Sequence, residues 1–185
     1  MTDAAHMTRD QLESGLDAIR AAPADTGVVR MIVRRPTTNG RQTTDVAELS
    51  AEDGLVGDNW RTREPSPDPD RQLTIMSARA AQLIAQDESR WALAGDQFYI
   101  DMDVSIANLP AGARLTMGDA VIQVTEPPHL GCRKFKSRFG ADALAFVNSD
   151  VGKELRLRGL NARVVRAGRV RVGDGVTRLV ATTGD

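Results

Sequence analysis

The sequence ARLTMGDAVIQVTE, residues 113–126, places apolar residues at alternate positions on both sides of a central Gly-Asp pair. Alternation with a period of two is typical of a strand with one buried face, and Gly118-Asp119 is typical of the turn between two such strands. A related pattern follows in ARVVRAGRVRVGDGVTRLV, residues 162–180, around Gly173-Asp174. We therefore predict a β-hairpin in each segment.

Further strands are predicted from alternating or short apolar runs, at residues 26–36, 43–50, 72–77 and 96–105, and Asn39-Gly40 predicts a hairpin turn between the first two. Helices are predicted at residues 8–22, capped by Thr8, at 77–86 and at 141–147, with another turn or two within 152–158. Short strands with tight turns and few helices indicate a mainly β protein, a β-barrel with decorating helices. The alternative, a doubly wound sheet, needs a regular alternation of strands and helices that is absent here.

The chain length of 185 residues suits one domain with a terminal appendage. We predict an N-terminal helical extension over residues 1–25 and a barrel domain over residues 26–185. Residues 54–72, GLVGDNWRTREPSPDPDRQ, contain three prolines and alternating charges and are predicted to be mostly loop. A loop of this length inside a compact domain is usually functional or mobile, so closure of residues 60–70 over a ligand is an open alternative.

The overall charge and hydropathy exclude some classes of protein. The formal net charge is -1 and aromatic residues make up 4% of the chain, whereas a nucleic-acid binder would be basic and would use aromatic stacking platforms. No apolar run approaches the roughly 20 residues of a membrane span, and the polar N-terminus does not resemble a secretory signal. We expect a cytoplasmic protein with no nucleic-acid partner and no membrane partner.

The segment EPPHLGCRKFKSRFG, residues 126–140, contains Cys132, the single cysteine of the chain. Pro127-Pro128 cannot continue a strand, so the thiol is expected in a loop just after one. Four cations follow it, and positive charge favours the thiolate, which is the nucleophile and the metal ligand: Arg133, Lys134, Lys136 and Arg138. The alternative is a small, buried, unreactive side chain.

Other polar residues are weaker candidates when taken singly. His129 is suited to ligating a metal, to acting as a base or to bonding the loop backbone, but one Cys and one His do not make a structural zinc site. Arg133 and Lys134 are suited to holding an anion such as phosphate, and Arg156, Arg158 and Arg163 would add to this if the fold brings them close. Asp58 and the pair Asp96-Gln97 each follow a glycine, where a turn or cap is the simpler interpretation.

Taken in order, several segments resemble the MOSC family, named for the C-terminal domain of molybdenum cofactor sulfurase. The matching segments span roughly residues 26–176, and their order is more specific than any one of them: GLVGD (54–58), RQLTIMS (71–77), GDQF (95–98), LPAGARLTMGDAVIQVTEPPHLGC (109–132) and GLNARVVRAGRVRVGDGV (159–176). The sequence departs from the family in having Asn59-Trp60 where many members have histidine, Asp96-Gln97 in place of Glu-Asn, and Leu130-Gly131-Cys132 in place of Pro-Cys. The resemblance implies a barrel-like MOSC fold.

The resemblance also implies chemistry for a stand-alone domain of this kind. In the family this cysteine is thought to carry sulfur as a persulfide or to coordinate the molybdenum of a bound pterin cofactor, and members are linked to cofactor sulfuration or to reduction of N-hydroxylated compounds. It implies a molybdenum-dependent oxidoreductase or sulfur-transfer protein with a small-molecule substrate and an external sulfur or electron donor protein. The residues expected to serve this function are Cys132 and His129 at the reacting centre, Cys132 as metal ligand, and Arg133, Lys134, Asp58, Arg71, Asp96 and Gln97 around the cofactor. The alternative is a non-catalytic barrel module that binds a small anion or a protein partner.

Overall fold

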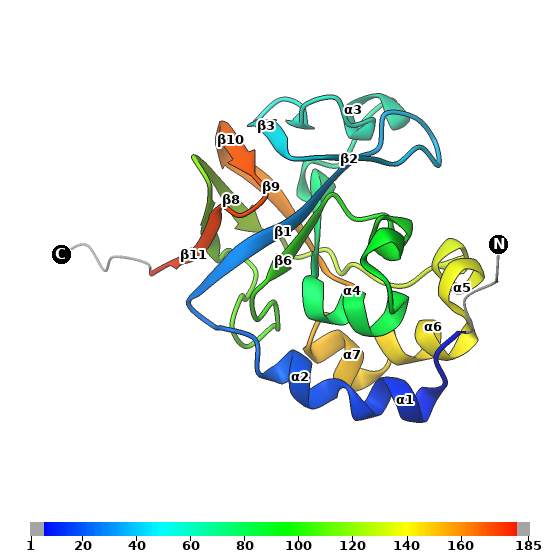
Figure 1. Cartoon of the computed structure of the whole chain (residues 1–185). Helices are drawn as coiled ribbons and strands as arrows, with labels where there is room; N and C mark the ends of the chain where they lie inside the picture. The colour runs from blue at the N-terminus through cyan, green and yellow to red at the C-terminus, as the bar shows by residue number, and fades with distance from the viewer. Residues whose placement is uncertain (1–5, 181–185) are drawn as a thin grey trace.

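A closed β-barrel forms the centre of the computed structural model, which describes residues 6–180 of the chain (Figure 1). Its strands follow the order β11-β7-β8-β9-β5-β6-β1, and pairing of β11 with β1 closes the ring. Only β5 and β6 pair in parallel; the other pairs in the ring are antiparallel. The strands are β1 (Thr26–Arg34), β5 (Leu73–Ser77), β6 (Phe98–Asp101), β7 (Arg114–Met117), β8 (Ala120–Val124), β9 (Leu160–Arg166) and β11 (Gly175–Leu179). The predicted barrel with decorating helices is confirmed.

The two Gly-Asp turns have different outcomes. Gly118-Asp119 joins β7 and β8 as an antiparallel hairpin in which Met117 faces Ala120, as predicted. The hairpin predicted around Gly173-Asp174 is wrong, because β10 (Gly168–Arg171) pairs with β3 (Val46–Ser50) while β11 pairs with β7 and β1. The reason is that this turn bonds to Val29, which donates to the Asp174 carbonyl at 2.9 Å and accepts from the Gly173 amide at 2.8 Å.

The Asn39-Gly40 turn joins two paired strands, as predicted, since β1 pairs antiparallel with β2 (Gln42–Thr44). The single strand predicted over residues 43–50 is wrong, because the chain leaves β2 at Asp45 and enters a second sheet as β3. That sheet has the order β10-β3-β4, with β4 at Gly54–Leu55. The long loop that follows contains α3 (Trp60–Arg63) and the 3-10 turn η1 (Pro69–Arg71).

The barrel interior is apolar. Its members alternate along the strands, as the period-two pattern requires. The predicted inward face of residues 96–105 is buried throughout, although β6 itself ends at Asp101. Buried residues of the interior include Val29, Ile32, Leu73, Ile75, Phe98, Ile100, Met102, Val104, Leu115, Ile122, Leu160 and Val176.

The helices gather on one side of the barrel, and a second apolar cluster fills the space between (Figure 1). They are α1 (Arg9–Ser14), α2 (Leu16–Arg20), α4 (Ala78–Ala85), the 3-10 segment η2 (Glu88–Ala94), α5 (Arg133–Phe139), α6 (Ala141–Val147) and α7 (Asp150–Glu154). Thr8 begins α1 with the predicted capping box to Gln11. The predicted helix over residues 8–22 is divided at Gly15, where an added Cβ would lie 2.5 Å from Leu83. No helix within residues 6–180 is long and apolar enough to span a membrane.

Candidate functional site

Cys132 lies between the end of β8 and the first turn of α5, where it is the N-cap residue. The loop before it is held by Asn148, whose Oδ1 accepts from the Gly131 amide at 2.8 Å and whose Nδ2 donates to the Gly131 carbonyl at 3.1 Å. A side chain at position 131 would begin 2.8 Å from Leu144 and Val147, so glycine permits this close approach. The thiol itself is exposed, and the alternative of a buried, inert cysteine is therefore wrong.

The surroundings of Cys132 favour its thiolate. Partial burial acts to raise the pKa of the thiol, but the backbone amides of Phe135 and Lys134 and the charges of Arg158 and Arg138 outweigh it, so the pKa lies below its ordinary value. Hydrogen bonds to the charged form and nearby opposite charges act in this direction. The sulfur is therefore both reachable and more readily ionised than that of a free cysteine.

The thiol opens onto a pocket of about 210 Å³, which we call the Cys132 pocket. Within residues 6–180 no aspartate or glutamate lines it, and six cations do: Arg35, Arg41, Arg63, Lys134, Arg138 and Arg158. Arg133 lies outside it, beside a shallower hollow of about 550 Å³ that also contains Cys132 and Lys134. On a protein of net charge -1, this local concentration of positive charge is the electrostatic condition for attracting an anion.

Three of these cations are held by uncharged partners, and none of the three has an ion pair among residues 6–180. Lys134 Nζ donates to Asn39 Oδ1 at 3.1 Å, Arg138 Nη1 to the Leu93 carbonyl at 2.6 Å, and Arg41 Nε to the Ala92 carbonyl at 3.1 Å. Burial, and then the charges of Arg138 and Arg35, lower the pKa of Arg41. These positively charged side chains repel one another, and a bound anion would reduce that repulsion.

Two buried carboxylates support the pocket from behind, and the first is Asp58. Its oxygens accept from Arg35 Nε and Nη2, each at 2.9 Å, and from the backbone amides of Arg35 at 2.9 Å and Trp60 at 3.0 Å. Arg35 Nη1 donates in addition to the Gly95 carbonyl at 3.1 Å. The guanidinium is thus fixed at the pocket wall by a bidentate pair, the strongest form of this contact.

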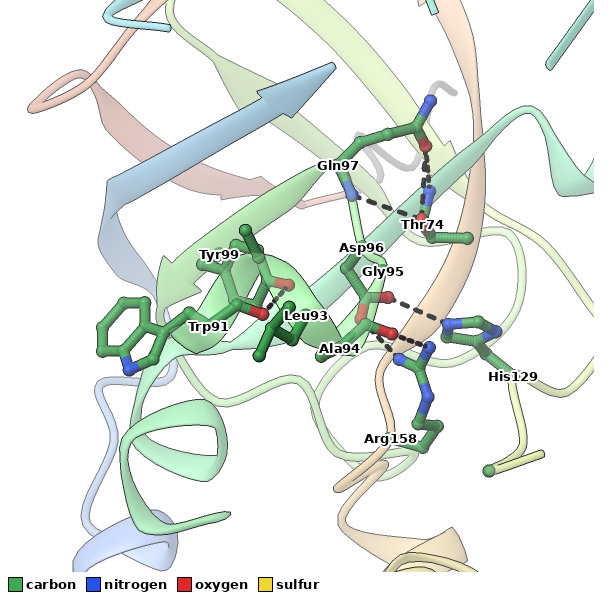
Figure 2. A network of polar contacts seen from close by, with 12 residues as sticks. Thr74, Trp91, Leu93, Ala94, Gly95, Asp96, Gln97, Tyr99, His129 and Arg158 are labelled. Carbon is green, nitrogen blue, oxygen red and sulfur yellow. Dashed lines mark hydrogen bonds and ion pairs between the residues drawn. The ribbon is translucent and has the colours of Figure 1, made fainter. Parts of the chain in front are cut away.

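The second carboxylate is Asp96, which lies between His129 and Arg158 (Figure 2). Its Oδ1 is 2.9 Å from His129 Nε2, and its Oδ2 accepts from Arg158 Nη1. Arg158 Nη2 donates to the Ala94 carbonyl at 2.8 Å, and the guanidinium lies over the Phe135 ring at 5.2 Å from its centroid. Burial acts to raise the pKa of Asp96, but the charge of Arg158, together with His129, lowers it to about 2.

His129 is kept neutral at neutral pH. Burial and then the charge of Arg158 lower the pKa of His129 more than Asp96 raises it. Because Asp96 is ionised and can only accept a hydrogen bond from His129 Nε2, the proton of the neutral ring belongs on Nε2. Nδ1 is then left as an acceptor. His129 lines the Cys132 pocket, so the site contains a thiol and an oriented imidazole.

Not every predicted site residue reaches the pocket. Arg71 is exposed in η1 and pairs with Asp68 at 3.5 Å, and Gln97 is buried with its Oε1 accepting from the Thr74 amide at 2.8 Å. Asp58 and Asp96 hold the arginines of the wall rather than lining it. Arg158 and Arg163 were expected to join the site only if the fold brought them near Cys132. Arg158 does line the Cys132 pocket, whereas Arg163 lies elsewhere and pairs with Asp70 at 3.4 Å.

Sequence reasoning missed three pocket arginines far from Cys132 in the chain, Arg35, Arg41 and Arg63. One signal was available, since Arg34-Arg35 stands at the end of a strand, before Pro36 and the Asn39-Gly40 turn. Two charged residues at the end of a mainly apolar strand lie at the rim of a barrel, where sites commonly form.

Comparison with known proteins agrees with this architecture. The profile described as MOSC domain matches residues 58–177, which is more than half of the chain. The chain belongs to the MOSC domain family. No curated protein matches it.

Three solved structures resemble this MOSC protein. The YuaD protein from Bacillus subtilis has a TM-score of 0.59 at 16% identity, covering 82% of this chain and 94% of that one. YiiM from Escherichia coli has a TM-score of 0.56 at 21% identity, covering 85% and 72%. YiiM from Geobacillus stearothermophilus has a TM-score of 0.54 at 15% identity, covering 86% and 77%. At these identities the likeness concerns the fold.

Proposed function

We propose that this MOSC domain binds the molybdenum cofactor in the Cys132 pocket, with Cys132 Sγ as the protein ligand of the metal. One observation carries the proposal: an exposed thiol with a lowered pKa opens onto six cations and no lining carboxylate within the described residues. A soft thiolate suits a redox-active metal, and a cluster of arginine and lysine suits the phosphate of a pterin cofactor.

The residues present fit such a group. Within residues 6–180 no three His, Cys, Asp or Glu side chains gather that could hold a metal ion, so a metal at Cys132 would bring its other ligands with it, as in a pterin cofactor. Arg158 Nε is buried and has no hydrogen-bond partner within the described residues, beside the pocket that Arg158 lines. The hollow beside Cys132 and Lys134 adds room for a ligand larger than the pocket alone would hold.

Each residue then has a defined task. The cofactor, when bound, supplies a metal centre that exchanges electrons with a small substrate such as an N-hydroxylated compound. Arg35 and Arg158 present fixed positive charge, because Asp58 and Asp96 hold them from behind. His129 keeps a proton on Nε2 and offers Nδ1 as an acceptor at the pocket wall. Electrons would come from an external donor protein.

A second function, carriage of sulfur as a persulfide on Cys132, is favoured by the exposure of the thiol at the N-cap of α5. The backbone amides of Phe135 and Lys134 that lower the thiol pKa would likewise favour an ionised terminal sulfur. The Cys132 thiolate would attack the outer sulfur of a persulfide on a donor protein, so that the donor's S–S bond breaks as the new one forms and the donor leaves as a thiolate. This function needs the same cysteine but no metal.

Purification from a host that makes the cofactor, followed by measurement of molybdenum and pterin, tests the proposal. We expect both in the native protein, loss of the metal in Cys132→Ser, and weakened retention in the double variant Arg41→Gln with Arg138→Gln. Arg114→Gln, an exposed arginine of β7 outside the pocket, is the matched control and should retain both.

The remaining outcomes separate the functions. No molybdenum, but the added mass of one sulfur atom on Cys132 after incubation with a sulfur donor, supports the persulfide carrier. Neither metal nor added sulfur supports a non-catalytic module that binds a small anion or a protein. Equal molybdenum in Cys132→Ser and the native protein would contradict the assignment of Cys132 as ligand.

A further inference from the structure

A second cavity of about 240 Å³ lies beside the loop that precedes Cys132, and we call it the apolar pocket. His129 lines both this cavity and the Cys132 pocket. Cys132 lines the Cys132 pocket and the shallower hollow beside it, but it does not line this second cavity. Six apolar side chains make most of its wall: Ile106, Pro127, Pro128, Leu130, Val147 and Leu160. A largely apolar cavity with few polar groups is the usual form of a small-molecule site.

Arg156 is the polar group that gives this cavity a direction. Its Nη1 donates to the Val104 carbonyl at 3.4 Å and to the Leu109 carbonyl, which fixes the guanidinium at the pocket wall. Its Nε and Nη2 have no hydrogen-bond partner among residues 6–180, and neither atom is fully buried. A rigid guanidinium with two free donors on one edge presents the fork that pairs with a carboxylate.

The charge of Arg156 is uncompensated and its backbone is strained. No carboxylate pairs with it among the described residues, and burial lowers the pKa of its guanidinium. Arginine nevertheless keeps its proton at neutral pH. Its φ of 49° lies in the left-handed region, which is unfavourable for a residue other than glycine. The surrounding structure therefore holds a half-buried cation in place although local conformation opposes it.

The other charges of the pocket favour an anion as well. Lys153 is a second cation of the lining, and Glu126, which is exposed, is the single carboxylate of the lining within residues 6–180. The lining thus has a net positive charge. A neutral ligand would leave the charge of Arg156 without a counter-charge, and a cation would be repelled by it.

We propose that the apolar pocket binds a small hydrophobic monocarboxylate. Its ring or branched chain lies against the apolar walls, and its two oxygens accept from Nε and Nη2 of Arg156. Because His129 lines both cavities, such a ligand contacts a residue that also lines the Cys132 pocket. The proposal goes beyond the binding of the molybdenum cofactor and does not rest on it, since it involves neither metal nor thiol.

Benzoate and its neutral isostere benzamide are the probes. Each is titrated into the His6→Gln protein, in which the imidazole signals in a nuclear magnetic resonance spectrum belong to His129. Inorganic phosphate is present throughout to occupy the Cys132 pocket. We expect benzoate to shift the His129 signals saturably and to bind at least tenfold more tightly than benzamide.

Two variants locate the site. Arg156→Gln should lower the affinity for benzoate at least tenfold, whereas Arg114→Gln should leave that affinity unchanged. Ile106→Trp places a larger side chain at the exposed rim of the pocket and leaves Arg156 intact, so it should also lower the affinity for benzoate. This variant tests the proposal if Arg156→Gln does not fold. The proposal is overturned if benzamide binds as tightly as benzoate, or if His129 does not respond. It is likewise overturned if benzoate binding is lost in Arg138→Gln but is unchanged in Arg156→Gln and Ile106→Trp proteins that fold.

Discussion

Asp58 and Asp96 are both fully buried, and each pairs with an arginine that lines the Cys132 pocket. Their remaining partners differ. Among residues 6–180, Asp58 accepts from Arg35 and from backbone amides, and no imidazole contacts it. Asp96 shares its charge between Arg158 and His129. The first carboxylate fixes the scaffold, and the second also links the scaffold to a group that titrates.

The largest effect should come from neutralising either carboxylate. Breaking a buried ion pair leaves an uncompensated charge, so Asp58→Asn and Asp96→Asn should each lower the free energy of unfolding by about 3 to 5 kcal/mol. Only Asp96→Asn should lower the pKa of His129 further, since Asp96 raises it in the native protein. Chemical denaturation measures the first effect and imidazole chemical shifts the second. An equal shift of His129 in both variants would break the comparison.

A smaller effect is expected from pH. Because the pKa of His129 is lowered on folding, the unfolded chain binds a proton below about pH 6.5 that the folded protein does not, so stability should fall as pH drops from 7 towards 5. His129→Gln should remove this slope, and His6→Gln should keep it. If the slope persists in His129→Gln, the imidazole is not its source.

Below that range Asp96 should dominate. Its pKa of about 2, against an ordinary 3.8, means that its contribution is complete above about pH 4 and is lost as pH falls towards 2. This loss should remain in His129→Gln, because Arg158 still holds the carboxylate. Thermal unfolding measured across the pH range separates the two steps.

The smallest effect concerns the thiol. Arg138 and Arg63 both line the Cys132 pocket, and the charge of Arg138 is one of the causes of the lowered pKa of Cys132. Arg138→Gln should therefore raise the pH at which alkylation of Cys132 is half-maximal, and Arg63→Gln should change it less. A larger shift in Arg63→Gln would show that Arg138 is not the stronger of the two influences on the thiol.

Local patterns predicted those parts of the fold that depend on local physics. The strand-turn-strand pattern around Gly118-Asp119 forms a hairpin, and the capping box at Thr8 begins a helix. The same kind of pattern failed at Gly173-Asp174, because that turn bonds to Val29 instead of closing a ladder between its own flanking strands. Alternation predicts a strand and its buried face, but it does not predict which strand will be the neighbour.

The candidate site shows the same division. The sequence alone showed the cations that follow Cys132 and the glycine before it, Gly131, which allows the loop to approach α6. Arg35, Arg41 and Arg158 were not placed, since they lie far along the chain from Cys132 and meet it only where β1, η2 and the start of β9 converge. Arg71 and Gln97 have suitable chemistry but face other parts of the molecule.

The sequence by itself determined the mainly β architecture and the position of a lone thiol among positive charges, because periodicity, turn residues and composition act over a few residues. The likeness to MOSC proteins rested instead on the order of several matching segments along the chain. The tertiary structure alone decided that Asp96 would hold both His129 and Arg158, that six cations would line one pocket, and that Arg156 would line another with no carboxylate partner among residues 6–180. These features depend on closure of the barrel, which brings together side chains that no local pattern relates.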